Sequence, residues 1–225
     1  MAKPTLFVDT DVETLKSQMD QNYFTSAYMA HAILNAWVKP SADAKTIAPP
    51  SKDAEARHLI FTASFVALYP LIGYAPYAPA KAALRNLSDT ISTEMNLYAH
   101  VAAPVKVHTI FPATIFTPAY ETENKIKTEL TKVVEGDEGQ SPEVVAEGSV
   151  ARLEAGDEMV TTWFLSRVVW SSIMGGSKRA SGLGWLIEGV LGMIAGWIMI
   201  FVRWDHDKTI RDWGKKHGTS GAKTT

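Results

Sequence analysis

Apolar residues recur three and four positions apart in several long segments of the chain, which is the spacing of one helix face. The segments with this pattern are 11–38, 77–99, 120–137 and 141–156. Pro79 fits the second of these helices because it falls in the first turn, where a backbone N–H is not needed. Between the first two helices, segment 39–57 is polar and contains three prolines, so it is predicted to be an exposed loop.

Short continuous apolar runs alternate with these helices. Two of them are 58–64 (HLIFTAS) and 105–111 (VKVHTIF), and 157–165 (DEMVTTWFL) is a candidate for a last short strand. Runs that are apolar on both faces are typical of strands in a parallel sheet covered by helices. The order helix, strand, helix, strand, helix, helix, strand therefore predicts an α/β fold with a parallel sheet.

The C-terminal part of the chain contains a much longer apolar segment. Residues 183–202 (LGWLIEGVLGMIAGWIMIFV) hold one charged side chain, Glu188. As a helix this segment matches the roughly 30 Å hydrocarbon core of a bilayer. Trp185 and Trp204 lie near its ends, as expected at membrane interfaces. We expect a membrane helix, and a buried amphipathic helix is the alternative.

The placement of this helix has more than one solution. Basic residues follow it, and the positive-inside bias then puts the C-terminal end in the cytosol. If the N-terminal part is also cytosolic, either 159–176 enters the membrane to form a hairpin or 183–202 lies in the interface without crossing. Gly192 and Gly196 have the GxxxG spacing of helix contacts in membranes, which makes a homodimer a candidate assembly.

Composition excludes several functions. The chain of 225 residues has a formal net charge of -2, which does not favour nucleic acid as a partner. It has no cysteine, so disulfides, thiolate metal sites and cysteine nucleophiles are ruled out. Its six histidines are scattered without the close spacing of metal ligands, and no metal site is predicted.

Candidate chemistry gathers in the stretch TASFVALYPLIGYAPYAPAK, residues 62–81. Ser64 ends a predicted strand, at the sheet edge where ligands bind in open α/β folds. Tyr77 and Lys81 are four residues apart at the start of a helix and share one face. An ammonium near a phenol should lower the tyrosine pKa and suit it to proton transfer. Tyr69 and Tyr74 have no lysine four residues on and are expected in the core or substrate wall.

Taken together these residues resemble the short-chain dehydrogenase/reductase family. The serine is followed after thirteen residues by Tyr77 and then by Lys81. QNYFTSAY resembles the family segment that supplies an asparagine, here Asn22. FPATIFTPAY resembles the loop after the sixth strand, with Ala113 in place of the usual glycine. The residues matched in that loop are Pro112, Ile115 and Thr117.

The resemblance implies a mechanism and a ligand set. NADPH would reduce a ketone, with Tyr77 as proton donor and Ser64 holding the carbonyl oxygen. Lys81 would lower the pKa of Tyr77 and bind the nicotinamide ribose, and Asn22 would hold a water that links Lys81 to solvent. The loop with Pro112, Ile115 and Thr117 would bind the nicotinamide.

Within the family, four segments resemble the membrane-bound reductases of a long-chain sphingoid ketone in sphingolipid synthesis: NYFTSAYMAHAIL, GYAPYAPAKAALRNLSDTISTEMNLY, FPATIFTPAYETENKIKTELTKVVE and the terminal apolar segment. This resemblance implies membrane lipid as a partner. It also implies a location in the endoplasmic reticulum membrane, with the active site facing the cytosol. The apolar side chains of 120–137 would touch the acyl chain or pack on their own domain; they are Ile126, Leu130, Val133 and Val134.

The family's glycine-rich phosphate loop and its Asn-Ala-Gly turn have no counterpart in this sequence. We therefore expect the C-terminal part of a Rossmann-type doubly wound sheet, without its N-terminal cofactor-binding half. The expected division is a partial catalytic domain over 1–165, a linker or interfacial helix over 166–182, a membrane helix over 183–202 and a basic polar tail over 203–225. A truncated, non-catalytic membrane-anchored relative and a reductase of another lipid ketone or steroid are the alternatives.

Overall fold

The computed structural model describes residues 2–39, 54–178, 184–219 and 221. In this part of the chain a three-stranded parallel sheet has the order β1 (Arg57–Thr62), β2 (Val105–Ile110) and β3 (Met159–Val160). β1 and β2 pair along their whole length, from Arg57 opposite Val105 to Thr62 opposite Ile110. All three strands therefore end at one edge of the sheet, and the predicted parallel α/β architecture is confirmed.

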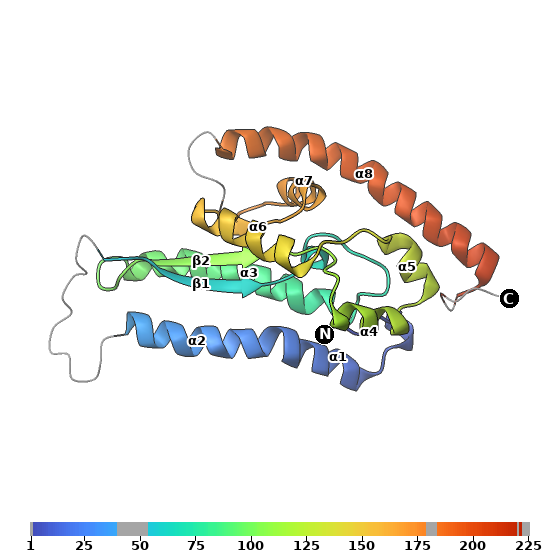
Figure 1. Ribbon diagram of the computed structural model, residues 1–225, viewed down its shortest axis with the longest axis horizontal. Helices are drawn as coiled ribbons and strands as arrows, with labels where there is room; N and C mark the ends of the chain where they lie inside the picture. Colours follow the sequence, from blue (N-terminus) through green and yellow to red (C-terminus); the bar gives the residue numbers. More distant parts are fainter. Residues whose placement is uncertain (1, 40–53, 179–183, 220, 222–225) are drawn as a thin grey trace.

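Helices cover both faces of the sheet. The α-helices of the described residues are α1 (Val12–Met19), α2 (Thr25–Val38), α3 (Ala78–Glu94), α4 (Pro118–Ile126), α5 (Glu129–Glu135), α6 (Pro142–Glu154), α7 (Phe164–Ser172) and α8 (Gly184–His217). A π-helical segment, η2 (Asp20–Phe24), joins α1 to α2. The 3-10 helices are η1 (Phe7–Asp9), η3 (Phe65–Ala67) and η4 (Met95–Tyr98). In Figure 1, α1 and α2 run along one side of the strands, and α7 and α8 lie on the opposite side.

Two apolar cores hold these layers together. The first joins α2 and α3 to β1 and β2, and its residues include Ala30, Leu34, Val38, Leu59, Phe61, Leu84, Ile91 and Val107. The four-residue spacing of Ala30, Leu34 and Val38 puts them on one face of α2, as the sequence pattern predicts. The second core lies on the α7 side, where the Phe111 and Trp170 rings stack with centroids 5.8 Å apart.

The second core also includes Met199 and Val202 of α8, so the long apolar helix packs on the domain. Gly192 makes this contact possible because a Cβ there would collide with the backbone carbonyl of Ser171 in α7. Arg167 of α7 forms an ion pair with Glu188 of α8, whose side chain is buried. The single charge of the apolar segment is therefore neutralised within the protein.

The outer face of α8 remains uncovered. Its exposed apolar side chains are Trp185, Leu186, Ile187, Val190, Met193, Ile194, Trp197, Ile198, Ile200, Phe201 and Trp204. Among the described residues, α8 is the one helix whose length and composition would allow it to cross a membrane. Gly192 already packs on α7, whereas no atom lies within 4 Å of a Cβ added at Gly196. The glycine pair therefore gives no support to dimerisation.

Three predicted elements differ from the structure. The helix expected over 120–137 is broken at Lys127, whose backbone is extended, and the Thr128 side chain caps the new helix α5. The strand expected over 157–165 has only two paired residues before α7 begins, since Trp163 starts a helix. α8 continues past Val202 to His217, so 203–217 is helical. Most of the predicted loop 39–57 lies outside the described residues.

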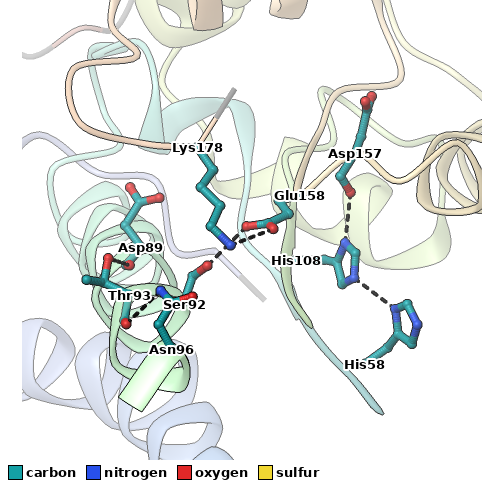
Figure 2. Close-up of polar contacts among 9 residues, drawn as sticks. All are labelled: His58, Asp89, Ser92, Thr93, Asn96, His108, Asp157, Glu158 and Lys178. Carbon is teal, nitrogen blue, oxygen red and sulfur yellow. Dashed lines mark hydrogen bonds and ion pairs between the residues drawn. The ribbon is translucent and has the colours of Figure 1, made fainter. Parts of the chain in front are cut away.

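Polar contacts attach the segment before β3 to its neighbours (Figure 2). The Nδ1 atom of buried His108 lies 2.8 Å from the Asp157 carbonyl oxygen, and its Nε2 lies 2.9 Å from Nδ1 of His58. A carbonyl oxygen only accepts, so Nδ1 of His108 donates and its Nε2 accepts from His58. Nearby, the Glu158 carboxylate accepts from Ser92 and Lys178. These contacts join β3 to β2 and α3.

Replacing Gly192 by alanine is expected to lower the thermal unfolding midpoint, because the new methyl group collides with the Ser171 carbonyl. Overpacking of this kind costs roughly 1–3 kcal/mol. Gly196→Ala is the matched control, since nothing lies within 4 Å of its Cβ position. The midpoints are measured in detergent. Equal midpoints for the two variants would contradict the packing of α8 on α7.

The folded state should lose stability as the pH falls below about 6.5 because of His108. Burial lowers the pKa of His108, and the nearby His58 and Lys106 side chains lower it further. The hydrogen bond to the Asp157 carbonyl and the Glu158 carboxylate act in the opposite direction, and the net shift is downward. The unfolded chain then binds more protons than the folded chain in acid. Unfolding midpoints of the wild type and of His108→Gln are compared over this pH range. A flatter dependence is expected for the variant, and the same slope in both proteins would refute this role.

Candidate active site

The loops that follow β1 and β2 lie against each other at the carboxyl edge of the sheet. Ser64 follows β1 and caps the short helix η3, accepting from the backbone N–H of Val66 at 3.4 Å. The N–H of Phe65 donates to the carbonyl of Pro112 in the next loop, at 2.8 Å. The strand ladder therefore continues into the loops and fixes Ser64 beside the loop after β2.

Tyr77 and Lys81 begin α3 as predicted. Tyr77 occupies the N-cap position and Lys81 follows in the first turn. The Lys81 ammonium lies 5.5 Å from the centroid of the Tyr77 ring and donates to the carbonyl oxygen of Thr62 at 3.0 Å. Lys81 thereby links the start of α3 to the end of β1 and brings Tyr77 toward Ser64.

The prediction of a lowered tyrosine pKa is wrong. Burial raises the pKa of Tyr77 well above its ordinary value, the Glu123 carboxylate raises it further, and a hydrogen bond with the Ser64 side chain opposes them. The Lys81 ammonium faces the ring and is held by Thr62, and it is not among the groups that shift this pKa. Burial likewise lowers the pKa of Lys81. The phenol is therefore held in its protonated form.

Asn22 lies in the π-helical segment between α1 and α2. Its side chain is buried, and its Nδ2 donates to the carbonyl oxygen of Gln18 at 3.0 Å. π-helical turns inside α-helices occur frequently at functional sites, because they leave backbone groups without the regular partner. The helical pattern of the sequence predicted a continuous α-helix here and did not reveal the π-helical segment.

A cavity of about 680 Å³ opens where these elements meet. Ser64, Tyr77, Ile115 and Thr117 line it. The other predicted site residues, Asn22, Lys81 and Pro112, are not part of its lining. Thr117 also caps α4 by accepting from the N–H of Tyr120 at 3.1 Å, so its position is set by the helix that it begins.

Two further walls complete the cavity. Apolar side chains of α7 and α8 and the segment before α7 form one wall: Trp163, Leu165, Val168, Val169, Ile198, Met199 and Val202. The Tyr69 hydroxyl lies 2.8 Å from Nδ1 of His206 and connects the segment after η3 to α8 beside this wall. Tyr69 and Tyr74 are buried and line the cavity, in agreement with their predicted place in the core or substrate wall.

The polar wall comes from α4 and α5 and was missed from the sequence. Glu123 and Glu135 line the cavity, and Lys127 lies between them with its ammonium 3.2 Å and 2.7 Å from their carboxylates. The four-residue spacing of Glu123 and Lys127 was the available signal. Of the side chains predicted to touch an acyl chain, only Val134 lines the cavity; Ile126 and Val133 are exposed because the helix breaks at Lys127.

The protein is similar in sequence to two fungal reductases. The 3-ketodihydrosphingosine reductase of Neurospora crassa is 40% identical over 220 residues, covering 97% of this chain and 58% of the relative. The 3-ketodihydrosphingosine reductase of Aspergillus fumigatus is 38% identical over 233 residues, covering 99% of this chain and 61% of the relative. The chain thus spans about three fifths of the length of these relatives. No family model matches the chain.

The fold is that of short-chain dehydrogenases. The short-chain dehydrogenase from Sphingobium yanoikuyae in complex with NADPH matches with a TM-score of 0.59 and 16% sequence identity, over 78% of this chain and 59% of that protein. The predicted resemblance, to these dehydrogenases and to 3-ketodihydrosphingosine reductases, is confirmed.

The phenol of Tyr77 should resist ionisation to a higher pH than an ordinary tyrosine, whose pKa is about 10. Replacing Glu123 by glutamine removes a nearby negative charge and should lower this pKa. The phenolate absorbance of Tyr77 is isolated by subtracting the titration of Tyr77→Phe. Glu121→Gln, an exposed change on the same helix, is the control. A pKa that does not move in Glu123→Gln would contradict the electrostatic coupling.

Proposed function

We propose that this chain carries the proton-transfer part of a reductase that converts 3-ketodihydrosphingosine to dihydrosphingosine with NADPH, in sphingolipid synthesis. The observation that carries the proposal is the meeting of Ser64 and Tyr77 in a largely apolar cavity at the carboxyl ends of parallel strands. The names of its relatives suggest the substrate, and the NADPH complex of a protein with the same fold suggests the cofactor.

Tyr77 donates a proton to the ketone oxygen in this proposal. A donor must hold its proton at neutral pH, and the raised pKa of Tyr77 meets this requirement. The Ser64 hydroxyl holds the same oxygen, since it lines the cavity with Tyr77 and acts on the Tyr77 pKa. Lys81 positions Tyr77 from the first turn of α3, and Asn22 holds a water that returns protons to Lys81. A phenol and a hydroxyl aimed at one oxygen stabilise the alkoxide as it forms.

The residues at the cavity fit the nicotinamide end of NADPH, which supplies the hydride when bound. Ile115 and Thr117 line the cavity in the loop beside Ser64 and would orient the carboxamide, with Pro112 shaping the loop. Lys81 would hold the ribose hydroxyls. Among the described residues no lysine or arginine lines the cavity, so the lining offers no cationic side chain to the phosphates. A non-catalytic relative stays the alternative.

We also propose that the outer face of α8 lies in the endoplasmic reticulum membrane, with the cavity on the cytosolic side. Its exposed apolar side chains, including Trp185, Trp197 and Trp204, face away from the domain. Basic residues follow the apolar part, which suits a cytosolic C-terminal end. Because α8 also packs on α7 and lines the cavity, it would lie in the membrane interface and not span the bilayer. A homodimer stays a prediction.

The Tyr77→Phe variant tests the chemistry. Loss of the phenol proton should lower NADPH-dependent reduction of 3-ketodihydrosphingosine about a hundredfold to ten-thousandfold. The exposed Tyr28 on α2 is the matched control, and Tyr28→Phe should retain full activity. NADPH binding to the wild-type chain is titrated in parallel. No binding and no turnover in the wild type would favour the non-catalytic alternative, and full activity of Tyr77→Phe would refute the proton donor.

Charges on the outer face of α8 test the membrane placement. The double substitution Trp197→Glu and Phe201→Glu should move the protein from floating with liposomes to the soluble fraction, since each buried charge opposes insertion. Met29→Glu, on the exposed face of α2, is the control and should leave flotation unchanged. Equal flotation of both variants would refute a membrane-embedded face on α8.

A further inference from the structure

The cavity that contains Tyr77 is acidic at its polar end. Four carboxylate residues line it: Glu123, Glu135, Asp137 and Glu138. Among the described residues no lysine or arginine is part of the lining, and His206 lies on the α8 side, bonded to Tyr69. The electrostatic potential at this end therefore favours a cationic ligand group over an anionic one.

Glu123 and Glu135 hold their charges in a compact, largely buried arrangement. The Lys127 side chain is fully buried, with its ammonium 2.7 Å from the Glu135 carboxylate and 3.2 Å from that of Glu123. Tyr74 donates its hydroxyl to Glu123 at 2.7 Å and is 3.1 Å from Glu135, and Thr114 donates to Glu135 at 3.2 Å. Two carboxylates share one cation, so the cluster keeps one net negative charge beside the cavity.

A net charge with little access to water is costly unless a partner neutralises it. Tyr74 cannot do so as a neutral hydroxyl. Burial, followed by the two carboxylates, raises the pKa of Tyr74 and keeps it neutral. The exposed fractions of the Glu123 and Glu135 side chains are 16% and 11%, and this remaining exposure opens onto the cavity that they line. A cation inside the cavity would complete the charge balance.

The acidic wall is close to the reacting group. The Glu123 carboxylate raises the pKa of Tyr77, which places its charge within electrostatic reach of the Tyr77 hydroxyl. The rings of Tyr74 and Tyr77 are neighbours, with centroids 6.3 Å apart. Leu165, Val168 and Met199 belong to the apolar wall made by α7 and α8. The cavity thus combines a hydrogen-bonding pair, an anionic wall and an apolar wall.

The proposed substrate, 3-ketodihydrosphingosine, has groups that match these three parts of the cavity, and the inference rests on the proposed function. In 3-ketodihydrosphingosine the carbon next to the ketone carries a primary amino group, and a long alkyl chain leaves the other side of the ketone. With the ketone oxygen on Ser64 and Tyr77, the amino group lies one carbon away. We propose that Glu123 and Glu135 bind this amino group in its protonated form and so make the site specific for long-chain amino ketones.

Two ligands separate this role from general binding of a ketone. One is 3-ketodihydrosphingosine, and the other is the same ketone with hydrogen in place of the amino group. The wild-type chain in detergent micelles should bind the amino ketone roughly tenfold to a hundredfold more tightly, as expected for a charge-assisted hydrogen bond. Binding is followed by tryptophan fluorescence, because Trp163 lines the cavity. Equal affinities in the wild type would overturn the inference.

Glu123→Gln should remove most of this preference, because it weakens binding of the amino ketone far more than binding of the uncharged ketone. Glu123→Asp keeps the charge and should retain part of the preference, and the exposed Glu121→Gln should retain all of it. Circular dichroism confirms that each variant is folded; if Glu123→Gln is not, Glu135→Gln replaces it. Equal weakening of both ligands would overturn the inference.

Turnover separates the inference from the proposed function. Reduction of both ketones without any preference for the amino ketone would support the reductase and overturn the amine site. Tight, charge-dependent binding of the amino ketone without reduction would support the amine site and overturn catalysis by this chain. If neither ligand binds to the wild type, both proposals are contradicted.

Discussion

The parallel backbone ladder between β1 and β2 is the constraint on which the rest of the structure depends. It holds the two strands in register from Arg57 opposite Val105 to Thr62 opposite Ile110. Their carboxyl ends consequently lie together, and the loops that follow bond to each other through Phe65 and Pro112. Ser64 is fixed in one of these loops, and the other leads to Thr117, which begins α4. The cavity exists because these connections leave the same sheet edge.

Burial decides the chemistry of that edge. The long helix α8 packs on α7 through Gly192 and closes one side of the cavity with Met199 and Val202. Removing water raises the pKa of Tyr77 and keeps its proton in place. The same helix shows an apolar face to the outside. One element therefore joins the exposed apolar surface to the buried surroundings of Tyr77.

The sequence predicted much of the fold because its signals were local. Apolar periodicity identified α2 and α3, and the serine–tyrosine–lysine spacing around Tyr77 indicated the candidate site. Predictions failed where long-range contacts decide the outcome. Lys127, at the helix break, forms an ion pair with Glu135, and no spacing pattern reveals this contact. The direction of the Tyr77 pKa depends on burial and on Glu123, two contributions that arise only after folding.

The central claim is that Tyr77 and Ser64 donate hydrogen bonds to the ketone oxygen of a bound substrate. The infrared carbonyl stretch of 3-ketodihydrosphingosine labelled with carbon-13 at the ketone tests this claim most directly. Two donors polarise the carbonyl bond and should move the stretch of the bound ketone to lower frequency than in an apolar solvent. The shift should shrink in Tyr77→Phe and in Ser64→Ala. A bound ketone with the frequency of the apolar solvent in the wild-type protein would contradict the account.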